Sequence, residues 1–197
     1  MSFRIEKKFF IKKENLFDFK KKLFLKNFKK LYQPRLVSSI YFDNNHFDMF
    51  NESIEGLTPR KKIRVRNYPN SNSSFFLLEN KISSIEGRFK TSKKISKNKF
   101  EHLIKNGILD KTYGTCKPII NIVYLREYLA AKDVRITVDT KINYNLFNKK
   151  QIKQDQNIIV ELKTSKDKNL DELLENFPYQ EIRFSKYCNG LEIFKKD

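Results

Sequence analysis

The sequence has no tryptophan, five glycines and only two cysteines. Cys116 and Cys188 lie far apart, and neither has a second thiol at the spacing of a metal-binding or redox motif. Such motifs are therefore excluded. We expect two free thiols, buried or partly exposed, in a protein of a reducing compartment.

Long apolar runs are also missing. No stretch approaches the ~20 apolar residues of a membrane-spanning helix, and the first residues, MSFRIEKKFF, carry charges where a signal peptide needs an apolar core. We expect a soluble cytoplasmic protein without a membrane span. The two histidines, His46 and His102, are isolated, which favours surface or structural roles over catalysis.

Acidic residues are too few to balance the basic ones, and the formal net charge is +18. This excess predicts a phosphate-rich partner, such as a nucleotide, polyphosphate, nucleic acid or an anionic membrane surface. The abundance of Lys, Asn, Ile and Phe is partly what AT-biased coding would produce, so the placement of arginine is more informative. The chain lacks the RNP, KH and zinc signatures of nucleic-acid-binding domains, and we expect no nucleic-acid partner.

The chain has enough apolar residues to form a hydrophobic core, since 39% of its 197 residues are hydrophobic and 18 are Phe. We expect one globular domain over residues 1–197. Alternating or β-rich segments predict strands at 3–11, 37–43, 61–68, 74–83, 88–95, 119–130, 133–144 and 157–164. Helical spacing predicts helices at 14–30, 96–107, 170–178 and 185–194. Without a βαβ rhythm, this is an α+β fold, and an antiparallel eight-stranded β-barrel with flanking helices suits it.

Charged residues recur two apart inside the predicted strands. The pairs are Glu6/Lys8, Arg64/Arg66, Glu79/Lys81 and Glu161/Lys163. Because residues i and i+2 of a strand point to the same side, each strand has one ionic face. A single such face could be the solvated side of a sheet. Four of them favour a cavity whose cations hold a polyanion, since unpaired cations inside a barrel are very costly.

Several motifs follow one another in a recognisable order: EKKFFI, SSIYFDN, KIRVRNY, LLENK, RFKTSK, VYLREYL, VRITVDT, VELK and RFSKYCNG. In this order they resemble the catalytic VTC domain, the polyphosphate polymerase of the vacuolar transporter chaperone complex and its bacterial relatives. That domain belongs to the triphosphate tunnel metalloenzyme (CYTH-like) superfamily. The resemblance implies a β-tunnel whose basic residues bind a nucleotide triphosphate and polyphosphate, while acidic residues hold Mg²⁺ or Mn²⁺.

Carried over by position, the resemblance implies a set of phosphate ligands: Lys8, Arg64, Arg66, Lys81, Lys90, Arg126, Arg135, Lys163, Arg183 and Lys186. Seven of these are implied to be catalytic: Lys8, Arg64, Arg66, Lys81, Arg126, Arg135 and Lys186. Glu161 is the leading metal ligand, with Glu6 and Glu79 as weaker candidates. Lys163 and Asp139 line or brace the tunnel, and the position of Lys90 could instead be taken by Lys93 or Lys94.

Three functions remain open. The first is transfer of the γ-phosphate of ATP, or another triphosphate, to polyphosphate. The second is its transfer to water, as in a triphosphatase. The third is polyphosphate binding without turnover, which retention of Glu161 with Arg126, Arg135 and Lys186 argues against. Tunnel hydrolases and cyclases begin with Glu-x-Glu-x-Lys, and Arg4 replaces the first Glu here, which favours the polymerase.

Overall fold

The computed structural model describes residues 4–70, 75–147, 149–165 and 179–195. The strands are β1 (Arg4–Ile11), β2 (Lys29–Asp43), β3 (Arg60–Asn67), β4 (Phe76–Ser84), β5 (Gly87–Ile95), β6 (Ile108–Asp110), β7 (Gly114–Ala131), β8 (Val134–Leu146), β9 (Ile152–Gln154) and β10 (Ile158–Ser165). The helices are α1 (Leu16–Leu25), α2 (Asp48–Glu55), α3 (Lys97–Asn106), α5 (Lys186–Lys195) and the 3₁₀ turn η1 (Lys13–Asn15). The helix predicted at 170–178 lies outside the described residues.

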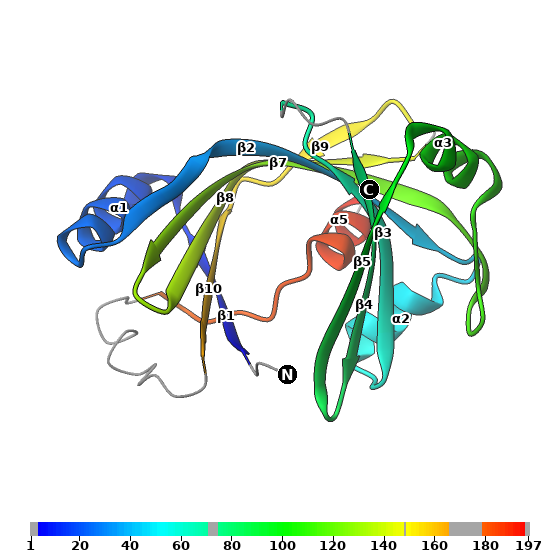
Figure 1. The fold of residues 1–197 in the computed structure, drawn as a ribbon, viewed down its shortest axis with the longest axis horizontal. Helices are drawn as coiled ribbons and strands as arrows, with labels where there is room; N and C mark the ends of the chain where they lie inside the picture. Colours follow the sequence, from blue (N-terminus) through cyan, green and yellow to red (C-terminus); the bar gives the residue numbers. More distant parts are fainter. Residues whose placement is uncertain (1–3, 71–74, 148, 166–178, 196–197) are drawn as a thin grey trace. The chain divides into compact units, whose positions relative to one another are not determined.

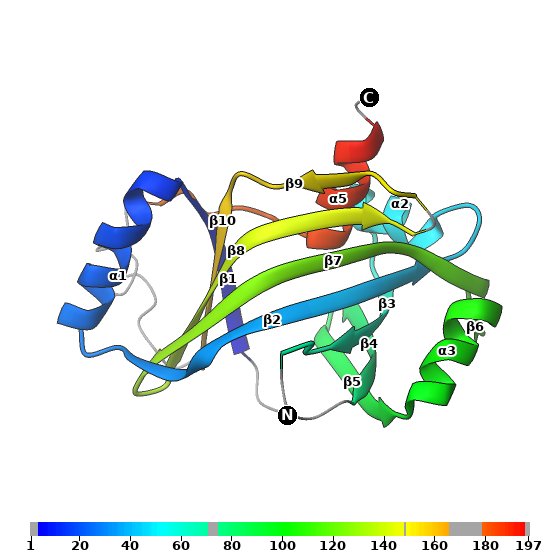
Figure 2. The same ribbon diagram turned by 90° about the horizontal axis from the view of Figure 1, so that it is seen from above.

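The strands follow the order β1-β10-β8-β7-β2-β3-β4-β5, with β6 beside β7 and β9 beside β8. The β1–β10, β10–β8, β2–β3, β3–β4 and β4–β5 ladders are all antiparallel. Figures 1 and 2 show these strands and the helices that accompany them. The predicted α+β class with an antiparallel sheet is confirmed. Closure of the eight strands into a barrel stays a prediction.

The largest differences from the predicted boundaries are in α1, β2 and β7, and β7 begins at Gly114, five residues before the expected start at 119. The helix expected at 14–30 ends at Leu25, because Asn27 adopts a left-handed conformation with φ 63° and β2 then begins at Lys29. The strand expected at 37–43 starts eight residues earlier. Residues 29–35 are all exposed, so this part of β2 lacks the alternation of apolar residues that reveals a half-buried strand. The three-residue strands β6 and β9 were not predicted, since they are too short for a periodic signal.

Helix α3 has the predicted ends. The Ser96 side chain accepts a hydrogen bond from the backbone N–H of Lys99, as an N-cap does. Gly107 ends the helix at φ +86°, and a Cβ there would lie 2.6 Å from the carbonyl oxygen of Cys116. Glycine is therefore required at this end by both the backbone conformation and the close approach of β7.

Ser96→Ala is expected to lower the free energy of unfolding by about 1 kcal/mol, because one N–H of the first turn loses its acceptor. Urea unfolding followed by circular dichroism measures the change. Ser92→Ala, in the exposed part of β5, is the matched control. Equal changes in the two variants would contradict the capping role.

The chain groups into two compact units, each assembled from separate segments. Unit 1 comprises residues 1–35, 124–142 and 155–184, and unit 2 comprises residues 36–123, 143–154 and 185–197. Each unit has its own buried cluster. One domain over residues 1–197 stays a prediction.

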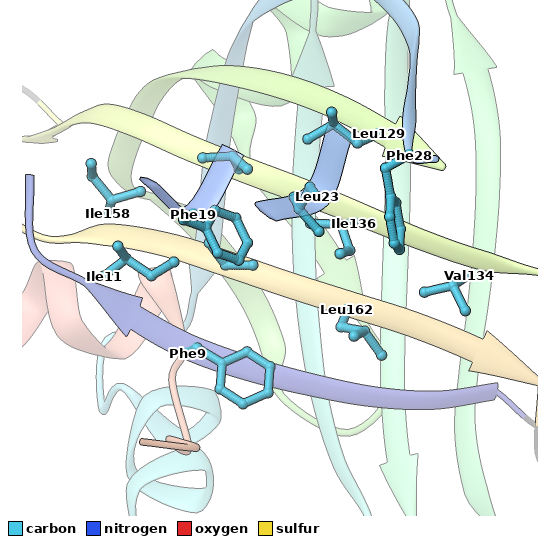
Figure 3. Packing of buried hydrophobic residues seen from close by; sticks show 12 residues of the cluster. Phe9, Ile11, Phe19, Leu23, Phe28, Leu129, Val134, Ile136, Ile158 and Leu162 are labelled. Atoms are coloured by element: carbon cyan, nitrogen blue, oxygen red, sulfur yellow. The ribbon is translucent and has the colours of Figure 1, made fainter. Parts of the chain in front are cut away.

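In unit 1, helix α1 packs against the apolar faces of β1, β8 and β10. Phe19 and Leu23 of α1 are buried with Ile11, Ile136 and Leu162 from these strands (Figure 3). These residues alternate with charged ones along β1 and β10, so burying the apolar side leaves the charged side of the same strands on the opposite face.

In unit 2, a buried carboxylate joins β2 to two helices. Asp43 accepts hydrogen bonds from the backbone N–H groups of Asn44, Met49 and Phe50, and the Tyr187 hydroxyl donates to it at 2.5 Å. Burial raises the pKa of Asp43 despite these hydrogen bonds. Burial and the nearby Asp43 carboxylate raise the pKa of Tyr187, which stays a protonated donor. Asp43 thus fixes the start of α2 and the position of α5.

Both cysteines are buried free thiols, as expected, and burial raises the pKa of Cys116 to about 11. Across the described ranges, every helix is too short or too polar to cross a membrane.

Candidate functional site

In unit 1, the side of β1 and β10 opposite the core is ionic. The ladder places Glu6 across from Lys163 and Lys8 across from Glu161. Opposite residues on antiparallel strands point to the same face, so two of the predicted charge pairs form one cluster. Arg126 of β7 and Asp139 of β8 complete it. We call these six residues the unit 1 ionic face.

Lys163 connects the two glutamates of this face. Its Nζ lies 2.7 Å from Glu161 Oε1 and 3.6 Å from Glu6 Oε2. Lys8 Nζ lies 3.5 Å from Glu6 Oε1 and also donates to the backbone oxygen of Phe184 at 2.9 Å. Phe184 is thereby held against β1.

Asp139 holds Arg126 in a fixed orientation. Arg126 Nε and Nη2 donate to the two carboxylate oxygens of Asp139 at 2.6 and 2.7 Å, and Asp139 is fully buried. Arg126 Nη2 also lies 3.8 Å from Glu161 Oε2. Burial alone would lower the pKa of Arg126, but Asp139, Tyr124 and Glu161 raise it well above its ordinary value. Asp139 therefore orients Arg126, and its lining or bracing of a tunnel stays a prediction.

The Glu161 carboxylate is charged at neutral pH. Its burial favours the protonated form, but the positive charges of Lys163, Arg126 and Lys8 outweigh burial and hold the pKa of Glu161 well below its usual range. A carboxylate must be deprotonated to bind a metal ion, and Glu161 meets this condition.

Unit 2 has its own ionic face on β2 to β5. The ladders place Arg64 between Tyr41 and Glu79, and Arg66 across from Ser39. Along β3, β4 and β5, eight cations share the side of Glu79, which we call the unit 2 ionic face: Arg60, Lys62, Arg64, Arg66, Lys81, Arg88, Lys90 and Lys94.

Glu79 is the counter-charge of this face. Its side chain is 1% exposed; Arg64 Nε donates to Oε2 at 2.7 Å, Lys90 contacts Oε1, and Arg66 Nε lies 4.0 Å away. Burial would raise the pKa of Glu79, yet Arg64, Arg66 and Lys90 lower it to about 2. The Glu79 carboxylate therefore orients Arg64 and Lys90, and its role as a metal ligand stays a prediction.

Tyr41 and Ser39 orient the arginines from the other side and were not among the sequence candidates. Arg64 Nη1 donates to the Tyr41 hydroxyl at 2.8 Å, and Arg66 Nε donates to Ser39 Oγ at 3.1 Å. The charges of Arg64 and Arg66 outweigh burial and lower the pKa of Tyr41. The alternation of SSIYFD puts Ser39 and Tyr41 on one face, and this signal could have identified them.

The remaining candidates are spread over both units. Lys90 lies across from Lys81 and shares its face with Lys94, whereas Lys93 points to the other side. In unit 1, Arg135 lies across from Lys163 and is exposed, as is Arg183. In unit 2, Lys186 begins α5 next to Ser185, whose hydroxyl accepts from Lys62 Nζ at 2.8 Å.

The family model for the VTC domain matches residues 3–195. The chain belongs to the VTC domain family. This match agrees with the resemblance carried by the ordered motifs. No curated protein matched this VTC domain.

Solved structures share the fold of this VTC domain. One is a Bacillus halodurans protein provisionally described as an adenylate cyclase, with TM-score 0.61, 13% identity and coverage of 93% of this chain and 94% of that one. Another, from Vibrio parahaemolyticus and described in the same way, has TM-score 0.60, 13% identity and coverage of 97% and 98%. A conserved protein of Pyrococcus furiosus has TM-score 0.56, 16% identity and coverage of 94% and 99%. At these identities the similarity shows the fold alone.

The donors of this VTC domain suit a divalent cation in unit 1. Within the described ranges, no group of three or more His, Cys, Asp or Glu side chains could hold a metal ion. Mg²⁺ bound to phosphates, however, needs only one or two carboxylates. Glu161 and Glu6 provide two, and both contact the ammonium group of Lys163. These two carboxylates offer the hard oxygen donors that such a cation needs.

The two ionic faces of this VTC domain differ in charge. On the unit 1 ionic face, Lys8, Arg126 and Lys163 pair with Glu6, Asp139 and Glu161, and Arg135 adds one cation beside them. On the described β3, β4 and β5 strands, Glu79 is the one carboxylate beside eight cations. The first face has carboxylates for a cation, and the second has a cationic excess for phosphate oxygens.

Proposed function

We propose that this chain is a metal-dependent polyphosphate polymerase that transfers the γ-phosphate of ATP, or another triphosphate, to a growing polyphosphate chain. The observation that carries the proposal is the unit 1 ionic face, where buried Glu161 stays charged beside Arg126 and Lys163. Membership of the VTC domain family supports it.

In the proposed reaction, a terminal oxygen of polyphosphate forms a bond to the γ-phosphorus. The bond between that phosphorus and the β–γ bridging oxygen breaks, and ADP leaves. Phosphoryl transfer of this kind depends on positioning and on neutralising charge, so the absence of a catalytic cysteine or histidine is consistent with it. When bound, Mg²⁺ or Mn²⁺ would neutralise part of the negative charge of the phosphates.

The residues take distinct parts in this proposal. Glu161 and Glu6 hold the metal ion, and Asp139 and Glu79 orient arginines. In unit 1, the residues that bind phosphate are Lys8, Arg126, Arg135, Lys163 and Arg183. In unit 2, they are Arg64, Arg66, Lys81, Lys90 and Lys186. Arginine suits the fixed positions, since its planar fork matches two phosphate oxygens.

The test is a product analysis. Purified protein is incubated with ATP and Mn²⁺ or Mg²⁺, and long-chain polyphosphate and free phosphate are resolved separately. We expect polymer. Free phosphate without polymer would show that water is the acceptor and that the protein is a triphosphatase. Binding of polyphosphate without either product would show that the protein binds polyphosphate but does not catalyse the transfer.

A further inference from the structure

The unit 1 ionic face contains a buried hydroxyl that neither the fold nor the ion pairs use. Thr137 of β8 is 3% exposed, and its Oγ1 has no hydrogen-bond partner among the described residues. Buried hydroxyls are normally hydrogen-bonded, and one that is not requires an explanation.

Register places this hydroxyl among the charged groups. Thr137 lies directly across from Glu161 in the β10–β8 ladder, and Arg135 and Asp139 are its same-face neighbours along β8. Side chains that are directly opposite on antiparallel strands have Cβ atoms about 5 Å apart. Thr137 is therefore within the ionic cluster and not in the apolar core on the other side.

We propose that Thr137 is a phosphate-binding residue whose hydroxyl donates a hydrogen bond to an oxygen of a triphosphate or polyphosphate held on the unit 1 ionic face. This inference rests on the proposed function, because it assigns a further ligand to the same site. Phosphate oxygens are strong acceptors, and a neutral hydroxyl donates to them without adding charge to the face.

A threonine suits this position better than another lysine would. Its β-branched side chain is stiff at χ1, so the hydroxyl is held in place before the ligand arrives. Long charged side chains such as Lys163 and Arg135 have many rotamers and can rearrange around a phosphate. The threonine hydroxyl then holds one phosphate oxygen at a fixed position.

The test measures binding of inorganic tripolyphosphate by isothermal titration calorimetry without added metal. Thr137→Val keeps the shape and removes the hydroxyl, and we expect Kd to rise at least tenfold, in line with hydrogen bonds to charged groups. The melting temperature should be unchanged or higher, since an unsatisfied buried hydroxyl is removed. Thr137→Ser restores the donor and should recover most of the affinity.

Thr164→Val is the matched control. Thr164 of β10 is also buried, its Oγ1 also has no hydrogen-bond partner within the described residues, and its register position puts it on the opposite side of the sheet from Lys163. We expect wild-type affinity in this variant. Equal weakening in both valine variants would show an effect on the fold and overturn the proposal.

Wild-type affinity in Thr137→Val would overturn the assignment of Thr137 while leaving the polymerase proposal intact. Loss of affinity in a protein that makes no polymer would support the ligand role and overturn the polymerase. A wild-type protein that does not bind tripolyphosphate at all would overturn both.

Discussion

Glu79→Ala is expected to lower the free energy of unfolding by about 3–5 kcal/mol, because it leaves Arg64 and Arg66 buried without their counter-charge. Both arginines are less than a tenth exposed, and Glu79 is their one carboxylate partner on the described β3, β4 and β5 strands. Urea unfolding of the wild type and the variant measures the loss. Glu86→Ala, at an exposed residue of the β4–β5 turn, is the control and should change stability little.

The same carboxylate gives stability a specific dependence on pH. The pKa of Glu79 is about 2 in the folded protein, against 4.5 as its ordinary value. A lowered folded pKa stabilises the protein above the ordinary pKa, and this contribution of about 3 kcal/mol is lost as pH falls from about 4.5 towards 2. Glu79→Ala should therefore remove part of the acid sensitivity. An unchanged difference between the two proteins from pH 7 down to pH 3 would contradict this account.

Glu161→Gln is expected to reduce polyphosphate synthesis about 100- to 1000-fold, because it removes the charge that would hold the metal ion and keeps the size of the side chain. The variant also leaves Lys163 and Arg126 with less negative charge nearby. Initial rates of polymer formation at saturating ATP, together with titration of Mn²⁺, measure the effect. We expect the Mn²⁺ concentration that gives half of the maximal rate to rise as well.

Glu181→Gln is the control for this substitution, since Glu181 pairs with Lys7 in unit 1 and has a half-exposed side chain. It should retain the wild-type rate. Thermal melts of both variants establish that they are folded. Full activity in Glu161→Gln would remove Glu161 from the metal site and contradict the proposed mechanism.

Much of the site was predictable because strand periodicity is local. The spacing of Glu6 and Lys8, or of Glu161 and Lys163, fixes a shared face before any partner strand is known. The ordered motifs then predicted the family, which the match over residues 3–195 confirmed.

The roles of individual residues were less predictable because they depend on pairing between distant strands. The ion pairs of Glu79 with Arg64 and Lys90, for example, follow from the register of β3, β4 and β5, which no local pattern reveals. Thr137 had no signal at all, since its significance arises from lying across from Glu161, 24 positions further along the chain. The sequence did not predict the start of β2 at Lys29 for another reason. Residues 29–35 are exposed, so they do not alternate between apolar and polar side chains as a half-buried strand does.

The interleaved segments of the two units also bear on how the protein is made. In unit 1, β1 pairs with β10, so Lys8 meets Glu161 only after more than 150 intervening residues have been synthesised. In unit 2, the Tyr187 hydroxyl meets Asp43 across a separation of 144 residues. Contacts between residues so far apart in the sequence slow folding. During translation, β1 leaves the ribosome as an unpaired strand that must wait for β10, and the ionic site is among the last parts of the protein to assemble.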